Sequence, residues 1–420
     1  MLVKFTVSNY KSFRNVASLN MTTGKRLKDL QKNIVQLWNW QEVVKSVAIF
    51  GANASGKSNL LEALWSATEF ILKWDRLLDA DEDIWFYQPF LFDTFSENNP
   101  TSCEFEFVID KILYHYVFSV IKKNVVSETL SYYPKNKEIV MFKRDGQHIL
   151  CNKKHFQDND VIGRVRPNVL ALDKFARENS PQAANIIKEF FSKINVLERD
   201  ERSSPSEFVK LMKEEKFEKF VTKLICSADL WIKKLSALKE EVPIEEIPDF
   251  IKERLNIKED QKTIGKSSIL AYHSVFNELN EDTGRLVWIT FLKESYWTQA
   301  IISLAPLFYE VFTAWGLLLI DELDDSLHPL LFKQLVESMH VPNVEDPRPY
   351  QIIYTCHTPN VLSTSILRRD QIYLTNKSDS WESNIYSISS YKARKDKDLE
   401  KWYLDEKLFG GVPNLNSTLF

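Results

Sequence analysis

The stretch SVAIFGANASGKSNLLEAL, residues 46–64, decides the fold class of this chain. Its centre, GANASGKS at 51–58, fits the pattern G-x4-G-K-[ST] without a mismatch. The short apolar run before it predicts a strand, and residues 57–72 have the periodicity of a helix. Glycines let such a loop wrap a phosphate and aim successive N–H groups at it, while the helix N-terminus adds its positive dipole. The pattern therefore predicts a phosphate-binding loop at a strand-to-helix turn.

Each residue type in this loop has a predicted task. Lys57 is predicted to reach the β- and γ-phosphates of a nucleotide and to take part in catalysis, and the Ser58 hydroxyl to ligate Mg²⁺. The residues predicted to hold the nucleotide are Gly51, Asn53, Ala54, Ser55, Gly56, Lys57, Ser58 and Asn59. The alternative is a chance match in an unrelated glycine turn, which the flanking strand and helix disfavour.

A second apolar run, LLLIDE at 317–322, ends in two adjacent carboxylates. Such a run is typical of a buried parallel strand, and ligands bind at the carboxyl edge of an α/β sheet. We expect Asp321 to hold Mg²⁺, directly or through water, and Glu322 to orient or deprotonate the attacking water. Taken alone, the run is also compatible with a core strand that simply ends at an acidic surface. The loop at 51–58 favours the magnesium site.

Two further residues are weaker candidates. His357 follows the apolar strand predicted at 352–355, and its imidazole is predicted to hydrogen-bond a γ-phosphate and report its presence. The alternative is a polar residue that merely ends a strand. Gln88, in the segment YQPF at 87–90, is predicted to touch Mg²⁺ or the attacking water from a loop, and a plain turn residue is the alternative.

The rest of the chain predicts an α/β fold with an antiparallel subdomain and a helical insertion. Residues 2–7 alternate as a strand does, and period two over about 90–144 predicts an antiparallel meander. Helical periodicity follows from about 165 to 265, with one face at Ile187, Phe190, Phe191 and Ile194. Strands resume near 269 and 286–291. We therefore expect three segments, an N-terminal half over 1–160, a helical insertion over 161–265 and a C-terminal half over 266–420.

Composition limits the class of protein. The chain has 420 residues, a formal net charge of -4 and a pI near 6.1, so a bulk electrostatic grip on nucleic acid is not indicated. The four cysteines lie far apart in sequence and suggest reduced thiols rather than a zinc or redox motif. The N-terminal segment MLVKFTVSNYKSF lacks the apolar core of a signal peptide, and no apolar run is long enough to cross a bilayer. We expect a cytoplasmic protein.

Five segments in order resemble one family. They are VKFTVSNYKSF, GANASGKSNLLEAL, LLLIDELDDSLHPLL, TCHTP and the C-terminal run from RRDQIY to FGGVP. Together they resemble the ABC-type P-loop ATPases of bacterial abortive-infection and anti-phage systems, the AbiL/RloA type, which are related to the OLD, RecF and SMC ATPases. The resemblance covers about 1–110 and 265–415, and the helical middle matches only in kind.

The resemblance implies an ABC-type ATPase head that binds ATP and Mg²⁺. It also implies a homodimer or higher oligomer in which two ATP molecules lie between heads, each held by the loop of one subunit and a signature segment of the other. In this sequence the signature segment is ESYWTQ at 294–299, where Ser295 would meet the γ-phosphate held by the partner. Members often act as sensor and scaffold for an effector nuclease or toxin encoded nearby.

One departure from the family pattern concerns catalysis. The family has Ser-x-Gly in the signature segment, and Trp297 stands at the glycine position here. Glycine lets a backbone approach a phosphate because it has no Cβ, so an indole there predicts slow hydrolysis or a site that closes only after a trigger. The alternative function is a RecF/SMC-like DNA-binding ATPase in DNA repair. An autonomous nuclease is disfavoured, because no metal-ligand cluster follows the ATPase segments.

Overall fold

The computed structural model describes most of the chain, and contacts divide it into two compact units. The described residues are 1–24, 27, 29–38, 41–73, 79, 82–135, 137–154, 159–178, 180–197, 205–227, 231–246, 263–314, 316–325, 327–341, 349–390 and 399–405. The first unit comprises Met1–Glu198, Ala314–Asp325 and Phe332–Phe420, and the second comprises Arg199–Thr313 and Ser326–Leu331.

A six-stranded sheet at the centre of the first unit carries the phosphate-loop strand. Its strands, in spatial order, are β11 (Ile194–Leu197), β15 (Leu317–Ile320), β16 (Gln351–Thr355), β5 (Ser46–Gly51), β17 (Ile372–Lys377) and β18 (Ser383–Ser387). The first five run parallel, and β18 pairs antiparallel with β17. Every residue of β5, β15 and β16 is buried, as expected for parallel strands covered on both faces. The α/β class predicted from the sequence is confirmed.

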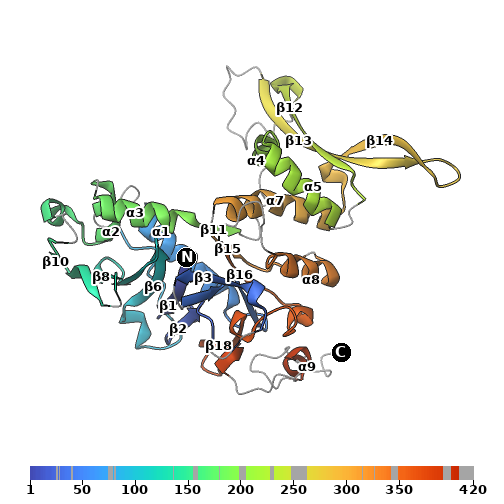
Figure 1. Ribbon diagram of the computed structural model, residues 1–420. Coiled ribbons are helices and arrows are strands. Elements are labelled where there is room, and N and C mark those ends of the chain that lie inside the picture. The colour runs from blue at the N-terminus through green and yellow to red at the C-terminus, as the bar shows by residue number, and fades with distance from the viewer. Residues whose placement is uncertain are drawn as a thin grey trace. The chain divides into compact units, whose positions relative to one another are not determined.

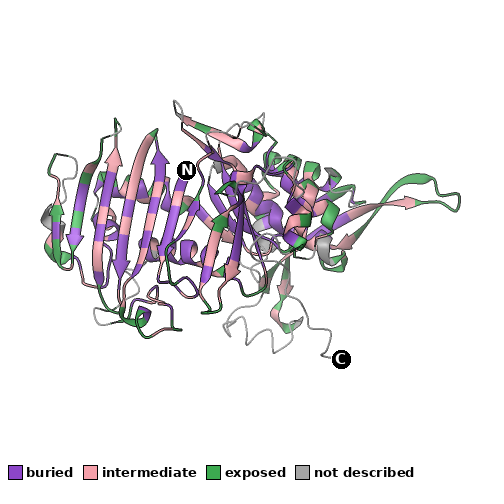
Figure 2. Cartoon of the chain, turned by 90° about the horizontal axis from the view of Figure 1, so that it is seen from below, coloured by how far each residue is buried: buried purple, intermediate pink, exposed green. Residues whose placement is uncertain are grey.

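A seven-stranded antiparallel sheet forms the other layer of this unit. Its strands, in spatial order, are β10 (His148–Cys151), β9 (Ile139–Asp145), β8 (Val125–Tyr133), β7 (Ile112–Val120), β6 (Thr101–Ile109), β1 (Leu2–Ser8) and β2 (Ala17–Asn20). Figure 2 shows buried and partly buried residues alternating along these strands. The buried face carries rings that pack across strands, such as Phe5 against Phe105 with centroids 5.0 Å apart. The period of two in the sequence thus corresponds to one buried face.

Helices fill the space against these sheets. They are α1 (Lys57–Lys73), α2 (Ala171–Arg177), α3 (Pro181–Glu189), α8 (Pro329–Ser338), which crosses the unit boundary, and α9 (Leu399–Leu404). Helix α1 contacts β1 of the antiparallel sheet and β5, β15 and β16 of the parallel sheet. Figure 1 shows α1, α2 and α3 along one side of the seven-stranded sheet. Helix α1 is therefore held by both sheets, and its first residue is Lys57.

Short elements complete the first unit. They are the hairpin β3 (Ile34–Trp38) and β4 (Gln41–Val44) and the 3₁₀ helices η1 (Gln31–Asn33), η3 (Ser96–Asn98), η4 (Asn159–Arg164), η5 (Phe191–Lys193), η8 (Pro359–Val361), η9 (Arg369–Gln371) and η10 (Ile388–Ser390). All four cysteines are free thiols.

A buried ion pair fixes α2 to the antiparallel sheet. The side chains of Arg144 and Glu128 are fully buried with their charged atoms 3.6 Å apart. Glu128 also accepts hydrogen bonds from the Tyr116 hydroxyl (2.8 Å) and from the first N–H groups of α2 at Ala171 (2.7 Å) and Leu172 (2.9 Å). Breaking such a pair from one side costs about 3–5 kcal/mol, because the other charge stays buried without compensation.

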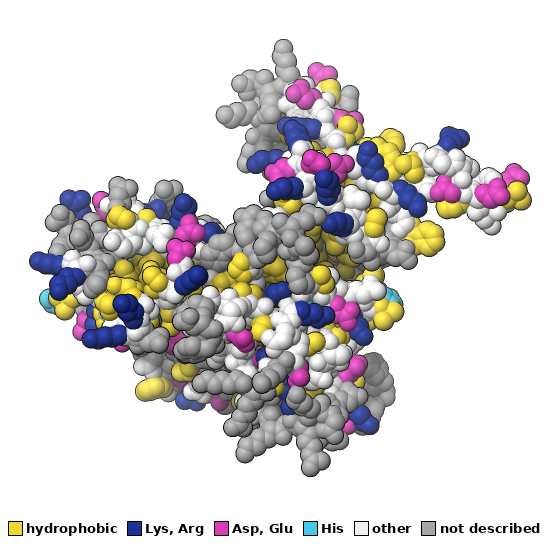
Figure 3. Space-filling view, in the orientation of Figure 1, with side chains coloured by type: hydrophobic (Ala, Val, Ile, Leu, Met, Phe, Trp, Pro, Cys, Tyr) yellow, Lys and Arg dark blue, Asp and Glu magenta, His cyan; other side chains and the backbone are white. Residues whose placement is uncertain are grey.

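The second unit has a small core and an exposed hairpin. Its elements are α4 (Pro205–Leu211), α5 (Glu215–Ser227), β12 (Lys234–Pro243), η6 (Ile244–Glu246), β13 (Thr263–Phe276), β14 (Asp282–Thr290), η7 (Phe291–Lys293) and α7 (Tyr296–Ala314). Rings of α4, α5 and α7 form the core, including Phe217 against Tyr309 with centroids 5.0 Å apart. Strand β14 and the turn before it are largely exposed (Figure 2), and apolar side chains lie on this exposed part of the hairpin (Figure 3).

Two expectations about the middle of the chain are wrong. The helix face predicted through Ile194 ends early, because α3 stops at Glu189 and Ile194 begins β11 at the edge of the parallel sheet. Pairing with β15 there satisfies a backbone that periodicity alone assigns to a helix. The stretch predicted to be helical also contains β12, which pairs along its whole length with β13. The second unit comprises Arg199–Thr313 and Ser326–Leu331, and α2 and α3 belong to the first.

Candidate active site

The predicted site residues follow three neighbouring parallel strands. In the order β15, β16, β5, these strands lead respectively into Asp321 and Glu322, into His357, and into the loop that ends at Lys57. Parallel strands present their carboxyl ends at one edge, so the three segments meet there. The sheet order thus places the strand that leads to His357 between the strand of the carboxylates and the strand of the loop.

Glycine is required at both positions of the loop because strands β17 and β18 of the same chain lie close to its backbone. Gly56 has φ +107°, and a Cβ at this position would collide with the Ser383 side chain. A Cβ at Gly51 would collide with Thr375. Ala54 has φ +61°, a backbone conformation uncommon for a residue with a side chain. The loop is therefore held in a strained, compact form, with strands β17 and β18 directly behind it.

Lys57 is buried and folds back onto the loop. Its Nζ atom donates to the carbonyl oxygens of Gly51 (2.7 Å) and Ala52 (3.1 Å) and lies 3.5 Å from Nδ1 of His357. Burial lowers the pKa of this amine, and the nearby carboxylates, including Asp321, act in the opposite direction. A cation surrounded by carbonyls and carboxylates can exchange these partners for phosphate oxygens.

A threonine on the middle strand positions the two adjacent carboxylates. The Thr355 hydroxyl donates to Oδ1 of Asp321 (2.5 Å) and accepts from the backbone N–H of Glu322 (2.7 Å). Glu322 has φ +50°, which is unusual for a residue with a long side chain. Its Oε1 atom lies 3.4 Å from Nε2 of His357. The turn after β15 thus aims one carboxylate at Thr355 and the other at the histidine.

The backbone at His357 is fixed by a buried aspartate. Oδ2 of Asp324 accepts from the N–H of His357 (2.9 Å), the N–H of Thr358 (2.6 Å) and the Thr358 hydroxyl (2.5 Å). The imidazole itself contacts Lys57 on one nitrogen and Glu322 on the other. Lys57, His357 and Glu322 therefore form one connected set, with His357 between the cation and the carboxylate.

The remaining loop residues divide by exposure. Asn53, Ala54 and Ser58 are exposed, as needed for groups that would meet a ligand. Ser55 is buried, and its hydroxyl lies 2.6 Å from that of Thr375. Asn59 donates from Nδ2 to the Ser12 hydroxyl (2.7 Å), so its side chain is engaged within the protein.

One match to a known protein family covers the phosphate loop, both carboxylates and His357. A family profile described as "AAA domain, putative AbiEii toxin, Type IV TA system" matches residues 46–363, about three quarters of the chain. The chain belongs to this AAA-domain family. The match confirms the resemblance to ATPases of abortive-infection type. A search of curated proteins gives no match.

In this AAA-domain protein, Gln88 is used within its own turn. The side-chain Nε2 atom of Gln88 donates to the Trp85 carbonyl (3.3 Å), and the backbone carbonyl of Gln88 accepts from the N–H of Lys11 (2.6 Å). The Lys11 side chain pairs with Glu62 on α1. The structure thus connects the Gln88 turn to α1 through Lys11, and contact of its side chain with Mg²⁺ or water stays a prediction.

Ser295 and Trp297 belong to the second unit of the AAA-domain protein. Ser295 is exposed, and its hydroxyl accepts from the N–H of Thr298 (3.3 Å) at the start of α7. The Thr298 hydroxyl lies 2.6 Å from the same oxygen. Ser295 therefore caps its own helix. The backbone of Trp297 is in the first turn of α7, and its side chain lies outside the described residues.

Five supporting residues are not assigned a role by the sequence analysis: Ser12, Asp324, Thr355, Thr375 and Ser383. They hold the loop and the carboxylates rather than facing a ligand. One local signal existed for two of them, since Thr355 and Asp324 lie within three residues of a predicted site residue. Ser12, Thr375 and Ser383 lie far from the loop in sequence, and only the fold brings them beside it.

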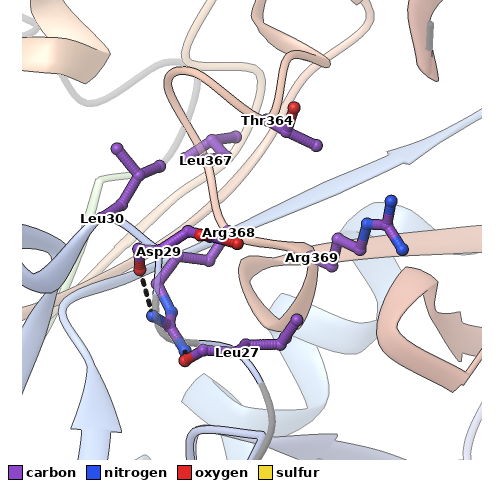
Figure 4. Close-up of a pocket in the computed structure, with 7 residues that line it drawn as sticks. All are labelled: Leu27, Asp29, Leu30, Thr364, Leu367, Arg368 and Arg369. Carbon is purple, nitrogen blue, oxygen red and sulfur yellow. Dashed lines mark hydrogen bonds between the residues drawn. The ribbon is translucent and has the colours of Figure 1, made fainter. Parts of the chain in front are cut away.

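A pocket of about 380 Å³ lies elsewhere on the AAA-domain protein. It is lined by Leu27, Asp29, Leu30, Thr364, Leu367, Arg368 and Arg369 (Figure 4). The buried Arg368 guanidinium donates to the carbonyls of Asp29 and Leu27 and to the Asp370 carboxylate. Arg368 thus joins two chain segments, and the pocket contains none of the predicted site residues.

None of the helices in the described part of the chain combines the length and apolar character needed to cross a bilayer.

Proposed function

We propose that this AAA-domain protein binds ATP and hydrolyses it slowly, as the ATPase subunit of an anti-phage defence system. In that role it is a sensor and scaffold, and it controls a partner effector nuclease. The observation that carries the proposal is the connected set of Lys57, His357 and Glu322 at three adjacent strand ends, with Asp321 beside them. Membership of the family associated with the AbiEii toxin supports the defence role.

The residues around the loop fit a magnesium nucleotide. The loop backbone packs closely against its neighbours at Gly51 and Gly56, where a Cβ would collide with them. The residues at 53, 54 and 58 are exposed. Loop N–H groups and Lys57 would hold the β- and γ-phosphates. Ser58 and Asp321 offer the oxygen ligands that Mg²⁺ prefers. When bound, Mg²⁺ neutralises charge on the phosphates.

Lys57 serves two states of this site. Its ammonium donates to the carbonyls of Gly51 and Ala52. Phosphate oxygens replace these partners when ATP binds. Because Lys57 is buried, an arriving anion gains a charge-assisted hydrogen bond with little water to displace.

Glu322 and His357 act on the water and the γ-phosphate. Glu322 accepts the proton of the attacking water, and the left-handed backbone at this residue fixes where its carboxylate points. His357 lies between Glu322 and Lys57 and donates a hydrogen bond to the γ-phosphate. Loss of that phosphate on hydrolysis removes a partner of His357, which gives the protein a way to report the nucleotide state.

The signature segment of a second subunit completes the site in this proposal. Ser295 of one chain meets the γ-phosphate held by the loop of the other, and the start of α7 adds its dipole. Trp297 at the glycine position slows closure, so ATP acts more as a conformational ligand for an assembly than as the substrate of a fast enzyme. The predicted cytoplasmic location suits such a complex.

The experiment that tests the proposal is ATP binding by Lys57→Ala. Isothermal titration should give clear binding for the wild type and affinity at least a hundredfold weaker for the variant, because the buried cation at the phosphates is lost. Lys188→Ala is the matched control, since the Lys188 side chain is 80% exposed on α3. Undiminished ATP affinity in Lys57→Ala would remove the loop from nucleotide binding.

A further inference from the structure

A tyrosine of the C-terminal helix α9 lies against the start of the phosphate loop. Tyr403 is 3% exposed, and its ring meets that of Phe50 edge-on, with centroids 6.2 Å apart. The backbone of Gly51 is a hydrogen-bond partner of the Tyr403 hydroxyl. The function proposed above makes no use of this side chain, which comes from the far end of the chain. A large side chain buried with its polar tip at the loop indicates that α9 contributes to the shape of the loop.

The way in which strand β5 ends explains the need for this hydroxyl. Strand β16 pairs with β5 as far as Thr355 opposite Ile49, and the N–H of Cys356 donates to the Ile49 carbonyl (3.1 Å). Backbone groups of alternate residues in a strand point to the same side, so those of Gly51 point toward β16 just beyond these paired residues. Gly51 is buried, and a buried N–H needs a partner. The Tyr403 hydroxyl supplies one where β16 no longer does.

Gly51 is thereby held at both of its backbone groups. Its carbonyl accepts from Nζ of Lys57 (2.7 Å), and its N–H meets the Tyr403 hydroxyl. In the function proposed above, Lys57 leaves this carbonyl when it turns to a phosphate. The contact with Tyr403 does not depend on Lys57 and can persist. The hydroxyl therefore matters most while phosphate is bound, when Gly51 has lost its other polar partner.

The same helix also contacts the segment that follows His357. Helix α9 packs against η8, which begins two residues after the histidine. Burial raises the pKa of Tyr403 to about 12, so the hydroxyl keeps its proton at neutral pH and can both accept and donate hydrogen bonds. Helix α9 thus touches the start of the loop and the segment next to the predicted γ-phosphate contact.

We propose that Tyr403 is a positioning residue for nucleotide binding and acts through the backbone of Gly51. The inference rests on the proposed function and adds the C-terminal helix to the site. Tyr403 does not touch the nucleotide, and it holds the start of the loop while Lys57 exchanges a carbonyl for phosphate. Loss of the hydroxyl should weaken ATP binding and leave the hydrolysis of bound ATP unchanged. Glu322 and His357 keep their own backbone partners in such a variant.

The test is Tyr403→Phe, which removes the hydroxyl and keeps the ring against Phe50. Titration calorimetry should show ATP affinity roughly three- to tenfold weaker, the loss expected for one hydrogen bond between uncharged groups. KM should rise by the same factor while kcat is unchanged. Tyr350→Phe is the matched control. Tyr350 is also buried, its hydroxyl donates to the Met339 carbonyl, and it lies just before β16, at the end remote from His357. This control should lose stability and keep the ATP affinity of the wild type.

The outcomes that overturn the inference are distinct from one another. Unchanged ATP affinity in Tyr403→Phe, with clear binding by the wild type, would refute the inference and leave the proposed function in place. Equal losses of affinity in Tyr403→Phe and Tyr350→Phe would assign the effect to general destabilisation. A fall in kcat at constant KM would place Tyr403 in the chemical step instead of in binding. A wild type that binds no ATP would remove the proposed function and, with it, the task of Tyr403.

Discussion

The molecule has two loop-to-helix junctions that are predicted to meet phosphate, and they are built differently. The loop at 51–58 leads into α1 and is held by residues from two distant parts of the chain, Ser12 and the β17–β18 hairpin with Thr375 and Ser383. The segment at 294–299 leads into α7 and is held locally, since Ser295 caps its own helix through Thr298. Glu294 is paired with His273 of the adjacent strand (2.7 Å).

The difference teaches where each junction gets its shape. The first junction is strained and prepared before a ligand arrives, because the sheet behind it leaves no room for a side chain at Gly51 or Gly56. The second junction already uses the hydroxyl that it would offer to a phosphate. A ligand at Ser295 must share that oxygen with the helix cap. We therefore expect ATP hydrolysis to require the residues around the first junction, and the second junction at α7 to modulate its rate.

The largest effect expected on this comparison comes from Glu322→Gln. This substitution removes the proposed general base beside the phosphate loop. It should lower ATP hydrolysis by about a hundredfold or more while ATP affinity is retained, since general base catalysis contributes on this scale. Steady-state phosphate release and equilibrium binding measure the two quantities separately. Glu278→Gln on the exposed hairpin is the control. Undiminished hydrolysis in Glu322→Gln would remove this residue from catalysis.

A smaller effect is expected on the α7 side. Trp297→Gly should raise hydrolysis about tenfold, because a backbone without Cβ can approach the phosphate closely. Trp297→Ala removes the indole and keeps Cβ, so a rate between those of wild type and Trp297→Gly separates the two causes. Equal rates for all three proteins would show that position 297 does not limit turnover.

The substitution Ser295→Ala distinguishes the two roles of the Ser295 hydroxyl, as a helix cap and as a predicted contact to the γ-phosphate. If the hydroxyl serves only as a helix cap, the variant should lose about 1 kcal/mol of stability in thermal unfolding with unchanged hydrolysis. A fall in hydrolysis with unchanged ATP affinity is the result expected of a signature residue.

The sequence predicts the first junction better than the middle of the chain for a physical reason. The loop at 51–58 and the run at 317–322 are local patterns whose chemistry demands particular residues at fixed spacing. Strand β11 has no such local pattern. Ile194 continues a helical periodicity, and its segment forms a strand only because it pairs with β15. Strand β12 likewise depends on β13. The hydroxyls of Ser12 and Ser383 could not be assigned either, since nothing in their neighbourhoods marks them as partners of Gly56.

The last effect concerns the N-terminal end of the loop strand β5 and depends on pH. His340 is fully buried, and its Nε2 atom lies 2.8 Å from the hydroxyl of Ser46, the first residue of β5, and 3.1 Å from Nε2 of Gln371. An amide nitrogen only donates, so this ring nitrogen accepts and the imidazole is neutral. Burial, helped by Lys45, lowers the pKa of His340 from 6.5 to about 3.

This lowered pKa predicts a loss of stability on the acid side. Below about pH 6.5 the unfolded chain takes up a proton at His340 that the folded chain refuses, so stability falls as pH decreases toward the folded value, by up to about 1.4 kcal/mol per pH unit. Urea unfolding of the wild type at pH 6.5 and 5 should differ by about 2 kcal/mol more than that of His340→Gln. His148→Gln, at an exposed position on β10, should keep the wild-type difference. An equal acid-side loss in His340→Gln would assign the pH dependence to other groups. The loop strand would then be anchored by its sheet neighbours alone, and the first junction would owe less of its rigidity to the buried network at Ser46 than to the contacts of Thr375 and Ser383.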